Sequence, residues 1–326
     1  MMDNNIPTHK SVMMNEVLEI LDPKSNETYI DCTLGAGGHT RKILDSADCH
    51  VIGIDRDPMV FSLNQDRYKS YGDRLTLING RFGELTNHIS KIGIKKVDAI
   101  FIDLGVSSMQ LDTPERGFSF RYDAPLDMRM DDNKTSVFDI INKYKEEDLA
   151  NIIYLFGEER KSRRIAKNII EQRKIKKIQT TFELSNIIKK SIGGKYQKIH
   201  PSTKTFQGLR IYLNDELKEL YSALVSSESI LNEGGKLIVI SFHSLEDRIV
   251  KNFIKYNSIS EKKYSLGNTE LPFYYKTKRV TKPTKSEIKE NPRSRSAHLR
   301  YVYRTSAQEI LKNNSHNFIK YGGVSV

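Results

Sequence analysis

The feature that most constrains this chain is a glycine-rich turn placed between two apolar runs. The turn covers residues 31–40, with the sequence DCTLGAGGHT, and the apolar run that follows it ends on a second acid, Asp55. Gly35, Gly37 and Gly38 let backbone N–H groups approach a ligand that a Cβ atom would keep away. A helix that opens at the end of the turn would point its N-terminus at the same ligand. This order of strand, tight turn and helix is typical of a nucleotide-type cofactor site.

The turn alone leaves the identity of the cofactor open. A dinucleotide fingerprint G-x-G-x-x-G that starts at Gly35 requires its third glycine at position 40, which is Thr40, and this argues against a pyrophosphate ligand. S-adenosylmethionine fits better, because it has no phosphate and needs acceptors for its ribose and ammonium groups, which Asp31 and Asp55 can supply. The alternative is a left-handed turn between a strand and a helix that binds no ligand.

The composition favours an anionic partner. The 326 residues carry a formal net charge of +11, and nucleic acid is the usual partner of such a chain, although a lysine-rich composition also produces a basic surface without any ligand. Cys32 and Cys49 lack metal-ligand spacing, which predicts reduced core residues. No apolar stretch approaches the ~20 residues of a membrane span, and the first ten residues lack the apolar core of a signal peptide, so we expect a cytoplasmic protein.

The order of strand and helix patterns predicts a doubly wound α/β fold. Five apolar runs are expected to form parallel strands that helices cover on both faces, namely residues 29–32, 51–55, 75–79, 97–104 and 236–242. The gap between the last two is far longer than the roughly dozen residues that a crossover needs, so a second, mostly helical domain is expected within it. The predicted divisions are a core at 1–108, a helical substrate-binding insert at 109–207, the second part of the core at 208–307 and a flexible tail at 308–326.

Polar side chains are expected to gather at one edge of the predicted sheet. Ligands of open α/β sheets bind beyond the carboxyl ends of the strands. The strand-end residues expected to share one crevice are therefore Asp31, Asp55, Asp103 and Ser241. An alternative for Asp55 and Asp103 is that each caps the helix that follows it.

Several segments together resemble one known family. They are residues 103–112, 116–120, 125–130, 156–160, 200–211, 214–217, 241–248 and 291–297. With these motifs the chain resembles the ribosomal RNA small-subunit methyltransferase H family, whose members methylate the exocyclic N4 of a cytidine in the decoding region of 16S rRNA. The matches extend over nearly the whole chain, from about residue 9 to residue 301. One departure is Ala124, where the family usually has glycine, and it affects only the local backbone.

The resemblance implies a cofactor, an architecture and a set of contacts. It implies S-adenosylmethionine as the methyl donor and a Rossmann-like methyltransferase core with a helical domain inserted after the fourth strand. Carried over residue by residue, the cofactor contacts of the family fall on Gly37, Gly38, His39, Asp55, Phe82, Asp103 and Gln110, and the glycine turn adds Asp31 and Gly35. Phe82 would stack on adenine, or it is an ordinary core residue at a strand end. A lone histidine such as His39 is a poor metal ligand, and no metal is predicted.

The acceptor determines what the catalytic residues must do. The N4 lone pair of cytosine is delocalised into the ring, so the enzyme must hold the amino group in line with the sulfonium methyl and accept hydrogen bonds from its protons. Many amine methyltransferases use an Asp/Asn/Ser-Pro-Pro-aromatic loop after the fourth strand, but residues 103–108 of this chain read DLGVSS. The candidates for the acceptor are Asp103, Ser107, Ser108, Asp112, Asp127 and His243.

The resemblance also implies an RNA partner. This partner is small-subunit ribosomal RNA in the assembled or nearly assembled subunit, with a homodimer left open as the assembly state of the protein. Two basic stretches, 160–167 and 278–304, are candidates for contacts with RNA phosphates, and a solvated helix face is the alternative for the first. Two other classes of function remain. An NAD-dependent enzyme is disfavoured by Thr40, and a non-catalytic RNA-binding protein is disfavoured because every cofactor position holds a suitable residue.

Overall fold

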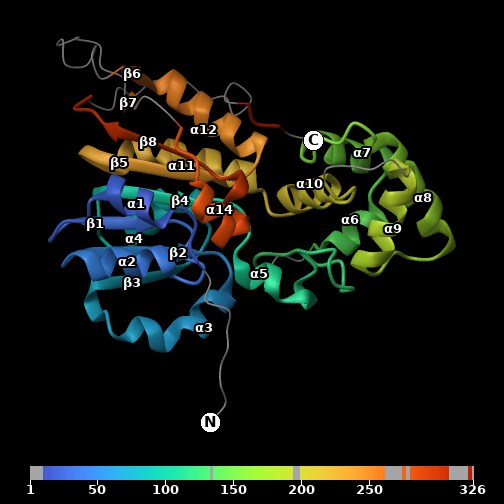
Figure 1. The fold of residues 1–326 in the computed structure, drawn as a ribbon, viewed down its shortest axis with the longest axis horizontal. Helices are drawn as coiled ribbons and strands as arrows, with labels where there is room; N and C mark the ends of the chain where they lie inside the picture. The colour runs from blue at the N-terminus through green and yellow to red at the C-terminus, as the bar shows by residue number, and fades with distance from the viewer. Residues whose placement is uncertain are drawn as a thin grey trace. The chain divides into compact units, whose positions relative to one another are not determined.

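The computed structural model describes residues 10–132, 135–193, 199–260, 274–276, 280–307 and 322–324. The chain divides into two compact units (Figure 1). The first consists of Met1–Gly105 with Lys218–Gly323, and the second of Val106–Leu217 with Val324–Val326. The predicted tail at 308–326 lies outside the described residues except for 322–324.

Among the described residues, the first unit is built on one eight-stranded sheet in the order β3-β2-β1-β4-β5-β8-β7-β6. The strands are β1 (Thr28–Asp31), β2 (His50–Asp55), β3 (Leu75–Asn79), β4 (Val97–Asp103), β5 (Leu231–Ser241), β6 (Ser258–Ser260), β7 (Tyr274–Lys276) and β8 (His298–Arg304). The first five strands pair in parallel, whereas β8 runs antiparallel between β5 and β7. The strand order reverses at β1 and β4, as in a doubly wound sheet, so the predicted fold class is confirmed.

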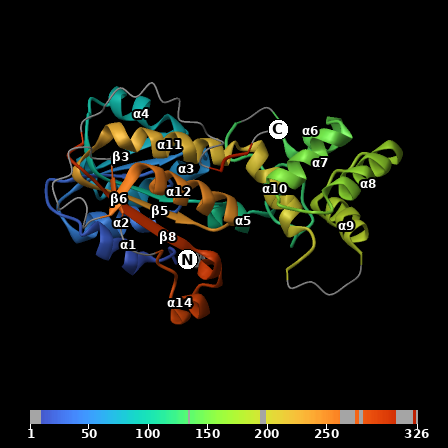
Figure 2. The ribbon, with the colours of Figure 1, turned by 90° about the horizontal axis from the view of Figure 1, so that it is seen from above.

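Helices cover both faces of the sheet (Figure 2). On one side lie α1 (Met14–Leu21) and α2 (Gly38–Ser46), and on the other lie α4 (Leu85–Lys91) and α11 (Glu216–Ile230). The unit also contains α3 (Pro58–Lys69), α12 (Ser244–Asn257), α14 (Lys285–Glu290) and the 3-10 turns η1 (Gly72–Arg74), η2 (Phe82–Glu84) and η4 (Pro292–Ser296). Successive residues of β4, such as Ile100, Phe101 and Ile102, are all buried. This explains why the strands are apolar without alternation.

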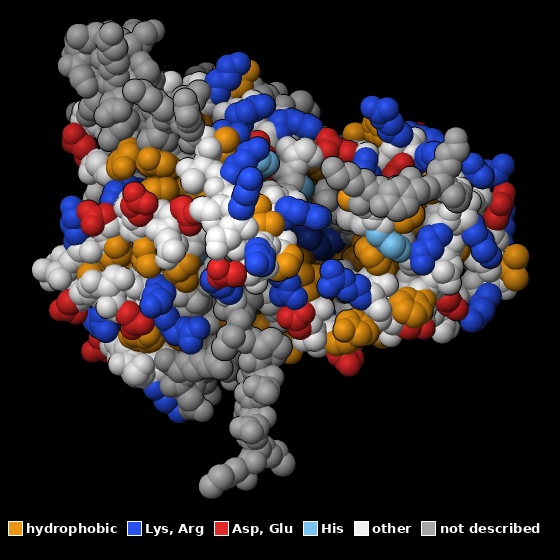
Figure 3. Space-filling view, in the orientation of Figure 1, with side chains coloured by type: hydrophobic (Ala, Val, Ile, Leu, Met, Phe, Trp, Pro, Cys, Tyr) orange, Lys and Arg blue, Asp and Glu red, His pale blue; other side chains and the backbone are white. Residues whose placement is uncertain are grey.

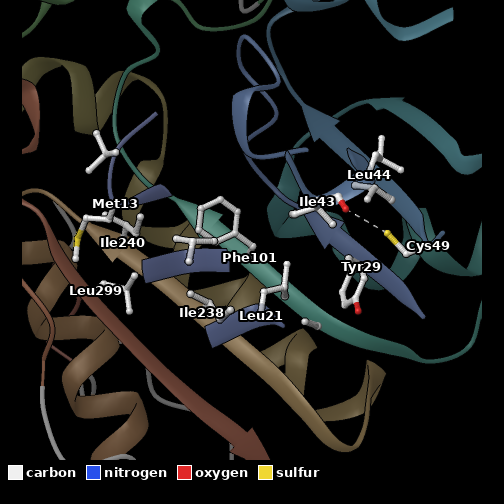
Figure 4. Close-up of a cluster of buried hydrophobic side chains, with 14 of the residues drawn as sticks. Met13, Leu21, Tyr29, Ile43, Leu44, Cys49, Phe101, Ile238, Ile240 and Leu299 are labelled. Atoms are coloured by element: carbon white, nitrogen blue, oxygen red, sulfur yellow. Dashed lines mark hydrogen bonds between the residues drawn. The ribbon is translucent and has the colours of Figure 1, made fainter. Parts of the chain in front are cut away.

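A hydrophobic core fills the space between the sheet and the helices α1 and α2 (Figure 4). Its buried side chains include Met13, Leu21, Tyr29, Ile43, Leu44, Phe101, Ile238, Ile240 and Leu299. Cys49 belongs to this core, and its thiol lies 3.7 Å from the carbonyl oxygen of Ile43. Both Cys32 and Cys49 are free and buried. Burial raises the pKa of each thiol, so both stay protonated and unreactive.

The second unit is helical, as expected for a domain inserted after the fourth strand. Its elements are α5 (Ser108–Asp112), η3 (Pro114–Arg116), α6 (Val137–Lys143), α7 (Glu146–Leu155), α8 (Ser162–Ile175), α9 (Thr181–Ile192) and α10 (Thr203–Leu213). A Cβ atom on Gly208 of α10 would lie 2.7 Å from the backbone nitrogen of Gly157, just after α7. The two backbones therefore touch at glycines. The unit includes all of α10 because that helix packs against α7, so it reaches beyond residue 207.

The structure corrects two details of the sequence analysis. The apolar spacing from Leu213 to Leu231 and the glycines at 234 and 235 predict a helix that ends at the glycines, but the helix before β5 ends at Ile230, and residues 231–235 belong to β5. The basic stretch 278–304 contains the unpredicted strand β8, which buries Leu299 and Val302 between charged and aromatic neighbours. Residues 278 and 279 lie outside the described part of the chain. No helix among the described residues has the length and apolar character needed to cross a bilayer.

Candidate functional site

Three carboxylates end neighbouring strands of the sheet. Asp31, Asp55 and Asp103 are the last residues of β1, β2 and β4, which are adjacent in the sheet. Ser241 ends β5, the next strand, and its hydroxyl lies 3.4 Å from the carbonyl oxygen of His298. Parallel strands present their carboxyl ends at one edge, so the sheet brings these four predicted residues together there.

The glycine turn is fastened to the end of β2. The backbone N–H of Gly35 donates to Oδ2 of Asp55 at 2.8 Å, and the N–H of Asp57 donates to Oδ1 at 2.9 Å. Each of these carboxylate oxygens has a second lone pair. Asp55 therefore shapes the turn and can still accept hydrogen bonds from a ligand.

The next two glycines leave no room for a side chain. Gly37 caps α2 with a left-handed φ of 69°, and a Cβ atom there would lie 2.2 Å from the Tyr68 hydroxyl oxygen. A Cβ atom on Gly38 would lie 2.0 Å from the Ser11 hydroxyl oxygen. The turn therefore needs glycine at Gly37, where both the backbone conformation and Tyr68 exclude a side chain, whereas at Gly38 a side chain would require Ser11 to move.

Two threonines hold the ends of β1 and β4. The Thr40 hydroxyl donates to Oδ2 of Asp31 at 2.7 Å, and the N–H of Thr33 donates to Oδ1 at 3.1 Å. The Thr33 hydroxyl oxygen accepts from the N–H of Asp103 at 2.8 Å. In the sequence, Thr40 stands out only as the residue that breaks the dinucleotide fingerprint. Its role as the partner of Asp31 has no signal in the sequence, because the two residues meet through the turn.

The strand-end carboxylates lie in a poorly solvated environment. Burial raises the pKa of Asp31 to about 6 and the pKa of Asp55 to about 6. Burial, and then the charges of Asp31 and Glu246, hold the pKa of Asp103 well above its usual range. Oδ1 of Asp103 is buried and has no hydrogen-bond partner among the described residues. A positively charged group beside these carboxylates would offset their repulsion and favour their ionised forms.

Glu246 is a buried residue of this site that the sequence analysis missed. Its Oε2 accepts from the N–H groups of Phe242 and His243 at 2.8 and 3.3 Å, and its Oε1 lies 3.0 Å from Nε2 of His243. Nδ1 of His243 accepts from the N–H of Glu246 at 3.4 Å, which completes a capping box at the start of α12. The three-residue spacing of the box was the available signal. His243 is thus fixed at the end of β5.

His39 and Phe82, two further predicted cofactor contacts, differ in burial. Nε2 of His39 lies 3.0 Å from the carbonyl oxygen of Val12, and its ring lies 4.6 Å from the ring of Phe101. Its burial and these contacts fix the start of α2 in place. Phe82 is partly exposed at the first position of η2, after β3. The residue after it, Gly83, donates its N–H to Glu219 at 2.9 Å, which anchors this loop to α11.

The other predicted site residues lie in the second unit. Ser107 and Gln110 form a capping box at the start of α5, in which each side chain accepts from the backbone N–H of the other, at 3.2 and 3.1 Å. Ser108 is the buried first residue of this helix. Gln110 is buried as well. The geometry gives Ser107 and Gln110 a structural role within the unit.

Asp127 is held by an arginine two residues away. Its Oδ1 accepts from Nε of Arg129 at 2.6 Å and its Oδ2 accepts from Nη2 at 2.8 Å. Although partial burial opposes its charge, the hydrogen bonds from Arg129 lower the pKa of Asp127, so it is ionised at neutral pH. The neighbouring Met128 has a left-handed φ of 59°, and its carbonyl oxygen accepts from Asn214 at 2.9 Å. Asn214 therefore helps to hold a backbone conformation that non-glycine residues seldom adopt.

The chain is similar to known methyltransferases along most of its length. A model of the MraW methylase family matches residues 7–305. Ribosomal RNA small subunit methyltransferase H of Rickettsia rickettsii (strain Sheila Smith) is 46% identical over 302 residues, which cover 90% of this chain and 97% of that protein. The protein of the same name from Orientia tsutsugamushi (strain Ikeda) is 47% identical over 309 residues, covering 91% and 97%.

Solved structures of methyltransferases also match the chain, at low sequence identity. An rRNA methylase from Streptococcus thermophilus has a TM-score of 0.39 at 10% identity, covering 90% of this chain and 93% of that chain. The N-methyltransferase NodS from Bradyrhizobium japonicum has a TM-score of 0.39 at 9% identity, covering 90% and 94%. The match to the family model and the two curated relatives together establish that this chain belongs to the MraW methylase family.

Proposed function

We propose that this chain is an S-adenosylmethionine-dependent methyltransferase that methylates the exocyclic N4 of a cytidine in the decoding region of 16S rRNA. Membership of the MraW methylase family and the names of the curated relatives support methyl transfer to small-subunit rRNA. The choice of N4 and of the decoding region extends the proposal through the motifs that the chain shares with the family. The proposed setting is the cytoplasm, with an assembled or nearly assembled small subunit as the substrate.

The observation that carries the proposal is the row of carboxylates at the strand ends. A buried oxygen of Asp103 that has no hydrogen-bond partner within the described part of the chain, together with the raised pKa values of Asp31 and Asp55, suits a ligand that brings positive charge. S-adenosylmethionine, when bound, supplies an electrophilic methyl group on a positively charged sulfur. The first-unit residues that would hold it are Asp31, Gly35, Gly37, Gly38, His39, Asp55, Phe82 and Asp103. Gln110, in the second unit, is carried over from the family motif alone.

The chain's own residues orient the acceptor and take up its proton. The amino group of cytosine is a weak nucleophile, so holding it in position provides most of the rate enhancement. Asp103 offers an oxygen that suits a hydrogen bond from the amino group. Its pKa is raised in part by the charge of the buried Glu246, and His243 lies beside that glutamate. In the second unit, Ser107, Ser108 and the ionised Asp127 are further candidate acceptors. A strong base is not required, because the proton can leave after the methyl group has been transferred.

The proposal is tested by mass spectrometry of nucleosides from small-subunit rRNA. Purified subunits that lack the modification are incubated with the protein and S-adenosylmethionine, and we expect N4-methylcytidine at one position of the decoding region. The control uses an Asp103→Asn variant whose thermal unfolding matches that of the wild type, and we expect little product from it. Methylation of another atom, of another region or of free RNA alone would refute the corresponding part of the proposal.

A further inference from the structure

A basic hollow lies at the carboxyl end of β5 in the first unit. Its volume is about 530 Å³, and three separate segments line it: residues 242–251, Lys282 and residues 295–298. The cations that line this basic hollow are Arg248, Lys251, Lys282 and Arg295, accompanied by His243 and His298. Figure 3 shows Lys and Arg side chains gathered on one face over the region of α12 and α14.

One wall of the basic hollow is a single face of α12. The lining residues Ser244, Asp247, Arg248 and Lys251 are spaced at i, i+3, i+4 and i+7, which places them on one side of the helix. The first turn of the helix therefore faces the hollow.

Asp247, the acidic residue of the lining, is itself paired with an arginine. Asp247 accepts two hydrogen bonds from Arg300 of β8, from Nε at 2.8 Å and from Nη2 at 3.0 Å. Arg300 is not part of the lining, so the negative charge of Asp247 is balanced from behind the wall. The other charged residues of the lining are the cations Arg248, Lys251, Lys282 and Arg295. A hollow of about 400 Å³ in the second unit differs, because Lys176 of its lining pairs with the lining residue Glu183 at 3.0 Å.

We propose that the basic hollow binds phosphodiester groups of the substrate RNA. This inference rests on the proposed function and assigns part of the RNA contact to particular residues. Phosphodiesters are recognised by arginine forks and lysine charges, and the hollow supplies both. The position of the basic hollow suits an RNA substrate, because Ile240, near the end of β5, pairs with Asp103 of β4. The hollow therefore opens at the same edge of the sheet as the strand-end carboxylates.

The test compares two arginines of one short helix. Arg295 lines the basic hollow, whereas Arg293, two residues earlier in η4 and also exposed, does not. Binding of a fluorescent small-subunit rRNA fragment to the full chain is measured by anisotropy over a range of salt concentrations. We expect Arg295→Ala to weaken binding about three- to tenfold and to reduce the slope of log affinity against log salt by about 0.7–1. We expect Lys251→Ala to reduce the affinity and the salt slope in the same way, and Arg293→Ala to leave both the affinity and the slope unchanged.

The outcomes separate this inference from the proposed function. Arg295→Ala should bind S-adenosylmethionine as the wild type does in calorimetry, and Arg295→Lys should retain most of the salt slope. Equal losses from Arg293→Ala and Arg295→Ala would show binding by the general basic surface and overturn the assignment. The assignment would also be overturned if Arg295→Ala weakened the binding of inorganic phosphate but left RNA binding unchanged. Failure of the proposed function would appear instead as a wild-type protein that binds RNA without methylating it.

Discussion

At the scale of single residues, the candidate site disfavours the ionised forms of its carboxyl groups when no ligand is bound. Asp31, Asp55 and Asp103 all have raised pKa values, whereas the surface-facing Asp139 is held at a pKa of about 2 by hydrogen bonds from Lys143 and Ser136. The sequence predicted the strand-end acids, because each follows an apolar run. It did not predict Glu246, which joins them only when α12 packs at the end of β5.

The raised pKa of Asp31 predicts a pH-dependent difference from Asp31→Asn. The folded protein keeps the proton of Asp31 up to about pH 6, whereas the unfolded chain loses it near pH 4, so this group stabilises the fold at low pH and the effect is lost as pH rises. Asparagine cannot ionise. Between pH 5 and 7.5, the wild type should lose about 1 kcal/mol of unfolding free energy relative to the variant. Urea unfolding without cofactor measures this, and a constant or opposite difference would contradict a pKa near 6.

At the scale of elements, the strands β1 to β5 and the turn after β1 were predictable, whereas β8 was not. Parallel strands buried on both faces leave continuous apolar runs in the sequence. The β8 sequence HLRYVYR lies within a basic stretch and has no strict alternation of apolar and polar residues, and its burial depends on β5 and β7 as neighbours. The helix before β5 was predicted too long because glycines at 234 and 235 usually end helices, and here they lie within a strand.

The glycine turn predicts unequal effects of two alanine substitutions. Gly37 and Gly72 both have positive φ values, of 69° and 53°, but only Gly37 is crowded, by Tyr68. Each substitution should cost about 1–2 kcal/mol for the left-handed backbone. Gly37→Ala should destabilise the protein further and weaken S-adenosylmethionine binding, and Gly72→Ala should leave binding unchanged. Urea unfolding and calorimetry measure the two quantities, and equal effects would show that the packing of the turn does not matter.

At the scale of the whole molecule, the two units carry different parts of the predicted site. The strand-end carboxylates, the glycine turn and the basic hollow belong to the first unit, and Ser107, Ser108, Gln110 and Asp127 belong to the second. The long gap between two apolar runs predicted the inserted helices. The basic hollow was not predictable, because it is assembled from three segments that are separate in the sequence.

This division predicts that Asp127→Ala separates binding from catalysis. If Asp127 accepts a hydrogen bond from the cytosine amino group, its removal should lower the methylation rate about 10–100-fold and leave cofactor affinity unchanged. The matched control is Asp123→Ala in the same unit, which removes an exposed carboxylate that accepts from the N–H of Phe182 at 3.2 Å. Single-turnover methylation and calorimetry make the comparison. Loss of cofactor binding, or a normal rate, would show that Asp127 has another role.

The place of β8 in the sheet also determines when the sheet can close during synthesis. β8 lies between β5 and β7, so it links the pair β6 and β7 to the rest of the sheet. Until residues 298–304 have left the ribosome, β5 remains an open edge that can pair with the wrong chain. Arg300 and one wall of the basic hollow are missing for the same period. A nascent chain can therefore fold its glycine turn early, but it acquires the proposed RNA contact only after residues 295–304 have been synthesised.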